Sequence, residues 1–181
     1  MILVDYSQVA LASILTFQRE LKGTESEVKN LIRHVTLSTL KSYKKKYGKE
    51  YGELVICCDG RKYWRREVFE HYKANRKKMR DNSDLDWHLI FDTLNEMRQE
   101  IADNFPWRVV HVDRAEADDI IAVLTKWAQE NDLHAEGLIE EPQKILILSS
   151  DKDFKQLQLA PFSSGNVRQW SPMQRKFISA S

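Results

Sequence analysis

The chain has 181 residues, of which 42% are hydrophobic, and a formal net charge of +1, which suits a single globular domain with a buried core. No stretch is long enough for a membrane span, and the N-terminus lacks the basic segment of a signal peptide. The only cysteines, Cys57 and Cys58, are adjacent; this excludes a disulfide framework and a zinc site built from thiols alone, and it favours a reducing cytoplasm.

The first half of the chain predicts two strands separated by two helices. The apolar run over residues 1–5 predicts a short buried strand, and residues 6–18 have apolar positions at helical spacing, with Ser7 as a candidate N-cap. Residues 25–47 predict a long helix that becomes basic near its end, where the cluster KSYKKKYGK lies. A second apolar strand is predicted over residues 53–59.

The second half continues the alternation of helices and strands. The predicted elements are a basic helix over 64–79, an amphipathic helix over 83–105 capped by Ser83 or Asp84, a third strand over 107–112, a helix over 116–131, a polar loop over 134–142, a fourth strand over 144–150, a short helix from about Asp153, and a fifth, edge strand over 166–170. This pattern indicates an α/β fold with a mainly parallel central sheet and helices on both faces. No repeat or linker divides the chain, so we expect one domain over residues 1–181.

Charge is segregated along the chain although the total is close to neutral. Residues 61–80 carry nine Lys and Arg against two Glu, a local charge of +7. Residues 81–119 carry eleven Asp and Glu against three Arg, a local charge of −8. This segregation is informative where the total charge is not.

Acidic side chains follow four predicted strands at the point where each strand ends. Asp5 and Asp59 close the first two strands, the sequence EADD follows the third, and DKD follows the fourth. Because the carboxyl ends of parallel strands share one edge of the sheet, where ligands bind, these acids are expected to meet there. The predicted cluster contains Asp5, Asp59, Glu116, Asp118, Asp151 and Asp153.

Such a cluster predicts a metal centre, because crowded carboxylates repel one another and a cation removes that cost. An all-oxygen site suits Mg²⁺ or Mn²⁺. Six carboxylates exceed what one Mg²⁺ usually takes from a protein, so two ions are expected, an arrangement that serves phosphodiester hydrolysis. One acid after a strand is more often a helix cap or a solvated loop residue, and for Asp119 the capping interpretation stays open.

The basic segment after the second strand predicts a nucleic-acid contact beside these acids. Its cations suit phosphates, and its aromatic rings suit base stacking. The alternative, a solvated basic helix whose Trp64 packs in the core, stays open. The candidate nucleic-acid-binding residues are Tyr63, Arg65, Arg66, Tyr72, Lys73, Arg76 and Lys77.

Five segments taken in order resemble the flap endonuclease and 5′-exonuclease family: LVDYSQVALA, CCDGRKYWRREVFEHYKANRKK, AEADDIIAVL, KILILSSDKDF and QWSPM. The resemblance runs over almost the whole chain. It implies a metal-dependent 5′-nuclease that removes RNA primers and 5′ flaps during replication. The expected substrates are therefore DNA with a 5′ flap or an RNA–DNA duplex.

The resemblance also assigns roles to individual residues. Asp5, Asp59, Glu116, Asp118 and Asp151 match the first metal group of the family, and Asp153 matches a member of the second. Lys73 and Arg76 match the catalytic cations of a helical arch, expected over about residues 61–82, and Tyr72 matches an aromatic residue just before them. Family members continue beyond the position of the last residue with a duplex-binding motif, so we expect a fragment, or a shortened or split enzyme.

Two alternatives remain open beside the 5′-nuclease. A PIN-type ribonuclease or a Toprim domain would also collect acids, but those folds lack a long basic arch after the second strand. A nucleic-acid-binding remnant with weak catalysis, or one half of a split nuclease, is the other alternative. Expected partners are a single-strand binding protein, a sliding clamp or a separately encoded C-terminal half, without a membrane, in the host cytoplasm if the gene belongs to a phage.

Overall fold

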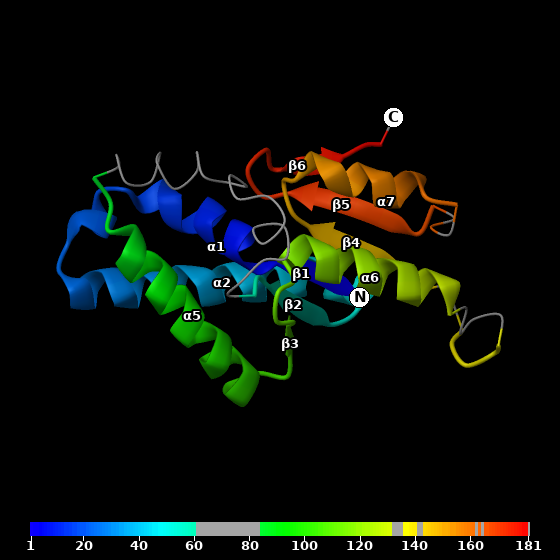
Figure 1. Ribbon diagram of the computed structural model, residues 1–181, viewed down its shortest axis with the longest axis horizontal. Coiled ribbons are helices and arrows are strands. Elements are labelled where there is room, and N and C mark those ends of the chain that lie inside the picture. The colour runs from blue at the N-terminus through cyan, green and yellow to red at the C-terminus, as the bar shows by residue number, and fades with distance from the viewer. Residues whose placement is uncertain (61–83, 132–135, 141–142, 162, 164, 181) are drawn as a thin grey trace.

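The computed structural model describes residues 1–60, 84–131, 136–140, 143–161, 163 and 165–180, and these ranges form a six-stranded sheet flanked by helices (Figure 1). The strands are β1 (Ile2–Asp5), β2 (Leu54–Cys58), β3 (Arg108–His111), β4 (Ile145–Leu148), β5 (Val167–Ser171) and β6 (Lys176–Ile178). Their order is β3-β2-β1-β4-β5-β6, and every neighbouring pair is parallel except β5 with β6. The predicted α/β class with a mainly parallel sheet is confirmed.

Helices cover both faces of this sheet (Figure 1). The described helices are α1 (Tyr6–Ile14), α2 (Glu25–Tyr51), α5 (Trp87–Asn104), α6 (Ala117–Glu130) and α7 (Lys155–Leu159), with 3₁₀ turns η1 (Leu15–Phe17), η2 (Glu20–Lys22) and η3 (Lys152–Phe154). Successive strand side chains point to opposite faces. Ile2 and Val4 therefore pack with α1, α2 and α5, whereas Leu3 packs with α6 and with Phe154 of η3.

The predicted edge position of the strand over 166–170 is wrong. Strand β5 pairs with β4 on one side and with β6 on the other, so β6 forms the edge. The chain turns back between Ser171 and Lys176, and the Arg175 amide donates to the Ser171 carbonyl at 2.8 Å within that turn. A three-residue strand with an exposed lysine gives too short an apolar pattern to be predicted.

Helix α2 runs four residues beyond the predicted end at residue 47. It begins as predicted, because the Glu27 amide donates to Thr24 Oγ1 at 3.3 Å and the Thr24 amide donates to Glu27 Oε2 at 3.0 Å. It ends at Gly52, whose φ of 98° is easy only for glycine. The extra turn is stabilised by Tyr51, which is buried and whose ring lies 6.5 Å from that of Tyr47.

Two predicted helix caps are wrong. Helix α1 begins at Tyr6 with Asp5 in the cap position, two residues before the predicted Ser7. Helix α5 is capped by Asp86, whose Oδ1 accepts from the Leu89 amide at 3.0 Å, rather than by Asp84. Within the described ranges, every helix is too short or too polar to span a bilayer.

Candidate active site

A half-buried aspartate, Asp5, lies in the acid cluster at the carboxyl edge of the sheet. It is the last residue of β1, at the start of α1. Burial, with the charges of Asp59, Asp118 and Asp151, raises the pKa of Asp5 to about 7, although a hydrogen bond from Ser149 opposes the shift. Carboxylates from four segments of the chain are thus close enough to repel one another, and a bound cation would relieve this repulsion.

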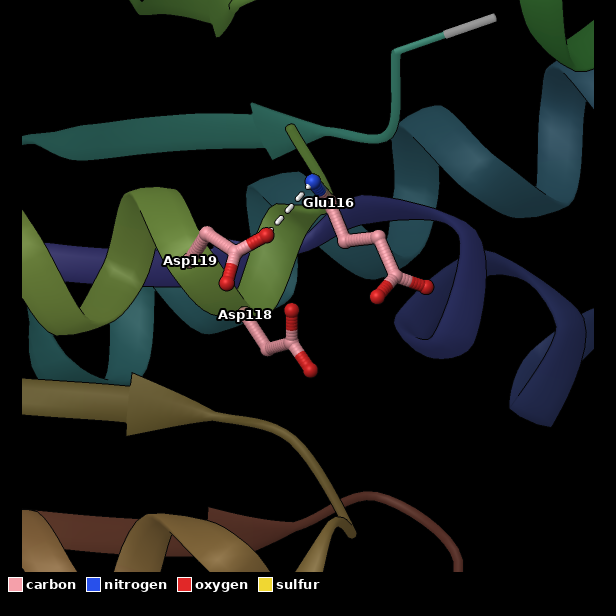
Figure 2. A group of neighbouring side chains, drawn as sticks. All are labelled: Glu116, Asp118 and Asp119. Atoms are coloured by element: carbon pink, nitrogen blue, oxygen red, sulfur yellow. Dashed lines mark hydrogen bonds between the residues drawn. The ribbon is translucent and has the colours of Figure 1, made fainter. Parts of the chain in front are cut away.

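A second group of acids lies at the N-terminus of α6. Carboxylate oxygens of Glu116, Asp118 and Asp119 lie within 4.8 Å of one another (Figure 2). Asp119 Oδ2 turns back and accepts from the Glu116 amide at 3.0 Å, so Asp119 does cap the helix, as its alternative interpretation held. Glu116 is only 1% exposed, and a helix N-terminus favours negative charge. Asp118 belongs to this group and also acts on Asp5.

Asp59 is fixed by contacts from two helices. Its Oδ1 accepts from the Ala117 amide at 2.7 Å, which ties the end of β2 to the first turn of α6. From the other face, Arg98 of α5 donates through Nη1 to the Asp59 carbonyl at 3.0 Å. Arg98 was not predicted from the sequence, where it is one basic residue in an acidic, amphipathic segment. Its role becomes visible only when α5 packs beside β2.

Gly60 permits the close approach of β2 to the segment before α6. Its amide donates to the Ala115 carbonyl at 2.8 Å. A Cβ at this position would lie 2.7 Å from the Val112 carbonyl oxygen, 3.0 Å from the Ala115 carbonyl oxygen and 3.1 Å from the Arg114 amide nitrogen. All three are backbone atoms, so a side chain here would displace the segment that positions Asp59.

We therefore expect Gly60→Ala to destabilise the fold by about 1–3 kcal/mol, as overpacking does in other cores, and to weaken the metal binding proposed below. Denaturant unfolding measures the first effect. The matched control is Gly48→Ala in α2, where the new Cβ meets only the flexible end of Lys44, at 3.0 Å, and alanine favours the helix. Equal stability of the two variants would contradict the expectation.

The loop after β4 is held by two polar residues that sequence reasoning missed. Ser149 Oγ donates to Asp5 Oδ2 at 2.9 Å and accepts from the Asp151 amide at 3.1 Å, so one hydroxyl links both acids. Gln169 of β5 is fully buried, and its Nε2 donates to the carbonyls of Ser149 at 2.8 Å and Asp151 at 2.7 Å. A glutamine at an inward position of a buried strand is a signal that could have drawn attention to this network.

The remaining predicted ligand, Asp153, lies at the rim of the cluster. Its backbone amide donates to Asp151 Oδ1 at 2.9 Å, and its side chain is exposed. The predicted arch lies outside the described residues, and so do its candidate side chains: Tyr63, Arg65, Arg66, Tyr72, Lys73, Arg76 and Lys77. Their roles stay predictions. Of the predicted loop 134–142, the described residues 136–140 form turns and bends.

Comparisons with known proteins agree with this arrangement. Residues 1–177 match the family model described as "5′-3′ exonuclease, N-terminal resolvase-like domain". Over 179 residues, the chain is 38% identical to ribonuclease H of Enterobacteria phage T4. The aligned region covers 97% of this chain and 53% of that protein. Over 117 residues it is 29% identical to the flap endonuclease Xni of Shewanella sediminis (strain HAW-EB3), covering 64% of this chain and 36% of that one.

Among solved structures, two from phage T5 share the fold. A T5 5′-exonuclease with bound zinc has a TM-score of 0.64 at 18% identity, covering 99% of this chain and 57% of that one. A T5 flap endonuclease crystallised with DNA and metal ions has a TM-score of 0.66 at 18% identity, covering 98% and 57%. The chain thus spans about half the length of the T4 relative and of these structures.

Proposed function

Because the chain belongs to the 5′-3′ exonuclease family through its N-terminal resolvase-like domain, we propose that it is the catalytic domain of a metal-dependent 5′-nuclease. Its substrates would be DNA with a 5′ flap or an RNA–DNA duplex. The observation that carries the proposal is Asp5, half-buried at the end of β1 and repelled by the charges of Asp59, Asp118 and Asp151. The family match favours this function over the PIN-type and Toprim alternatives.

The donor set fits a hard divalent cation such as Mg²⁺ or Mn²⁺, since all the side-chain ligands are carboxylate oxygens. The residues that would hold the first ion are Asp5, Asp59, Glu116, Asp118 and Asp151. Asp153, at the rim, would contribute to a second. When bound, such ions supply a hydroxide at neutral pH and stabilise the charge on the attacked phosphate.

The protein's own residues would prepare this site in four ways. Ser149 orients the Asp5 carboxylate through its hydrogen bond, and Gln169 holds the backbone that carries Asp151. The Ala117 amide fixes Asp59 so that one of its oxygens keeps a set direction. Cations of the predicted arch, Lys73 and Arg76, would offset the negative charge that an approaching phosphate meets.

Cleavage of a labelled 5′-flap DNA and of an RNA–DNA duplex, with Mg²⁺, with Mn²⁺ and with chelator, tests the proposal. We expect ion-dependent release of 5′ products. We further propose that a polypeptide equivalent to the downstream half of the longer relatives raises the rate, because added phosphate contacts raise affinity. If no substrate is cleaved with either ion, alone or with that polypeptide, the chain is a nucleic-acid-binding remnant instead.

The predicted arch gives a separate expectation for Lys73→Ala and Arg76→Ala. Each change should lower the cleavage rate by roughly tenfold to a hundredfold, since each removes a cation expected near the attacked phosphate. The melting temperature should stay within about a degree or two, as for most surface substitutions. Lys78→Ala, in the same segment but outside the matched positions, is the control. A parallel loss of melting temperature and rate would mean that these side chains stabilise the helix instead of acting on the phosphate.

A further inference from the structure

The basic cluster in the last turns of α2 lies on the β5–β6 hairpin, apart from the acid cluster. The Tyr47 ring lies 6.0 Å from Trp170 and 6.1 Å from Phe177, which fastens the helix to the hairpin. Trp170 and Phe177 are paired across the two strands with ring centroids 5.0 Å apart. The helix and the hairpin therefore present one continuous and rigid surface.

Cations on this surface are held by rings rather than by carboxylates. Lys46 Nζ lies 4.9 Å from the Trp170 ring centre and 5.3 Å from that of Tyr47. The Arg168 guanidinium lies 3.7 Å from the centre of the Phe177 ring. A cation–π contact orders a side chain without neutralising its charge. These cations remain charged and exposed toward solvent.

Three further cations extend the surface. Lys45 and Lys49 are exposed, and Lys49 lies four residues after Lys45 and three after Lys46, so it neighbours both on the surface of α2. Arg175, in the β5–β6 turn, is near enough to Tyr43 for its charge to oppose the burial that raises the pKa of that tyrosine. We call this surface the hairpin patch: Lys45, Lys46, Lys49, Arg168 and Arg175.

The hairpin patch is strongly positive in a chain whose net charge is only +1. Among the described residues, no carboxylate forms an ion pair with any of its five cations. The nearby Glu50 lies 4.0 Å from Lys144 instead. By contrast, Lys44, on the other side of α2, is paired with Glu53 at 2.6 Å.

The patch adjoins the candidate active site through the turn of the hairpin. Ser171 Oγ donates to Ser150 Oγ at 2.8 Å, and the Met173 amide donates to the same oxygen at 3.1 Å. Ser150 directly precedes Asp151 in the chain. A polyanion bound along the patch would therefore lead toward the acid cluster.

We propose that the hairpin patch binds the phosphate backbone of the double-stranded part of the substrate. This inference rests on the proposed nuclease function and adds a contact separate from the predicted arch. The rings of the patch are buried or half-buried beneath the cations, so they are not available to stack on bases, as single-strand binding would require. Ordered cations without base contacts suit sequence-independent binding of duplex phosphates.

The test is fluorescence anisotropy with the full chain in chelator, using a labelled duplex and a single strand of the same length. The triple variant Lys46→Ala/Lys49→Ala/Arg168→Ala should bind the duplex about tenfold more weakly at low salt, and its salt slope should be smaller by about two to three. Its affinity for the single strand should change less than about threefold. Lys45→Ala/Lys49→Ala, which removes no ring contact, should give a smaller loss in the same direction without affecting the melting temperature.

The charge-matched control is Lys22→Ala/Arg108→Ala/Lys126→Ala, which removes three exposed cations from η2, β3 and α6. An equal loss of duplex binding in this control, an equal loss for the single strand, or no duplex binding by the wild type would overturn the proposal. Flap cleavage with Mn²⁺ separates the two hypotheses. If the wild type cleaves the flap but the triple variant binds the duplex as tightly as the wild type does, the proposed role of the hairpin patch is wrong and the nuclease proposal stands. If the triple variant loses duplex binding but no protein cleaves the flap, the nuclease proposal is wrong and the role of the patch stands.

Discussion

Asp5→Asn is expected to lower cleavage on the order of 10³-fold while making the metal-free protein more stable. Asparagine has nearly the same shape as aspartate, and its side-chain oxygen can still accept the hydrogen bond from Ser149. What it lacks is the negative charge that a cation would need. The same charge is unfavourable without the cation, because Asp5 is buried beside Asp59, Asp118 and Asp151.

The size of the stabilisation follows from the pKa of Asp5. Its rise from 3.8 to about 7 corresponds to a cost on the order of 4 kcal/mol for ionising Asp5 in the folded state. At about pH 8, where Asp5 is ionised, Asp5→Asn removes this cost and should raise the free energy of unfolding by up to that amount. Urea unfolding in chelator measures it, and flap cleavage with Mn²⁺ measures the loss of activity.

The control for this substitution is Asp113→Asn, an exposed aspartate in the turn after β3. It should change neither stability nor cleavage by much, since a surface aspartate carries little burial cost. An Asp5→Asn variant that is less stable than the wild type in chelator would show that the carboxylate contributes more through its hydrogen bond than it costs through burial.

The sequence predicts much of this site because its ligands follow buried strands. Strands β1, β2 and β4 are near-continuous apolar runs, so their ends are visible, and the acids next to those ends could be placed together by the geometry of a parallel sheet alone. Asp5, Asp59 and Asp151 needed only this argument. For Asp119 the sequence suggested two roles, membership of the acid cluster and capping of the helix, but it could not decide between them.

The supporting residues could not be predicted, because their roles depend on contacts between segments far apart in the chain. Gln169 acts on the loop after β4, and Arg98 acts on the end of β2, 39 positions earlier. Arg98 has no local pattern that differs from an ordinary helix position, and the only local sign of Gln169 is a polar residue at an inward strand position. The same holds for the hairpin patch, where the lysines of α2 are visible in the sequence but the strand residues that complete the surface are not.

The stability of the metal-free protein is expected to fall as the pH rises from about 4 to about 7 and then to level off. In the unfolded chain Asp5 loses its proton near the ordinary pKa of 3.8, whereas in the folded protein it keeps the proton up to about pH 7. Between those values the unfolded state binds fewer protons than the folded state, so the free energy of unfolding decreases with rising pH. Asp5→Asn should lack this decrease.

Saturating Mn²⁺ should abolish that pH dependence. The ion needs the ionised form of Asp5, so binding releases a proton, and the affinity should fall about tenfold for each pH unit below 7. At about pH 8 an ion far above its dissociation constant should stabilise the fold by about 3–4 kcal/mol, and at about pH 5 by much less. Urea unfolding across this range, in chelator and in millimolar Mn²⁺, gives two curves whose difference should be small at low pH, grow as the pH rises to about 7 and stay constant above that pH. Parallel curves would mean that the ion binds without displacing the Asp5 proton, and the proposed ligand role of Asp5 would then be wrong.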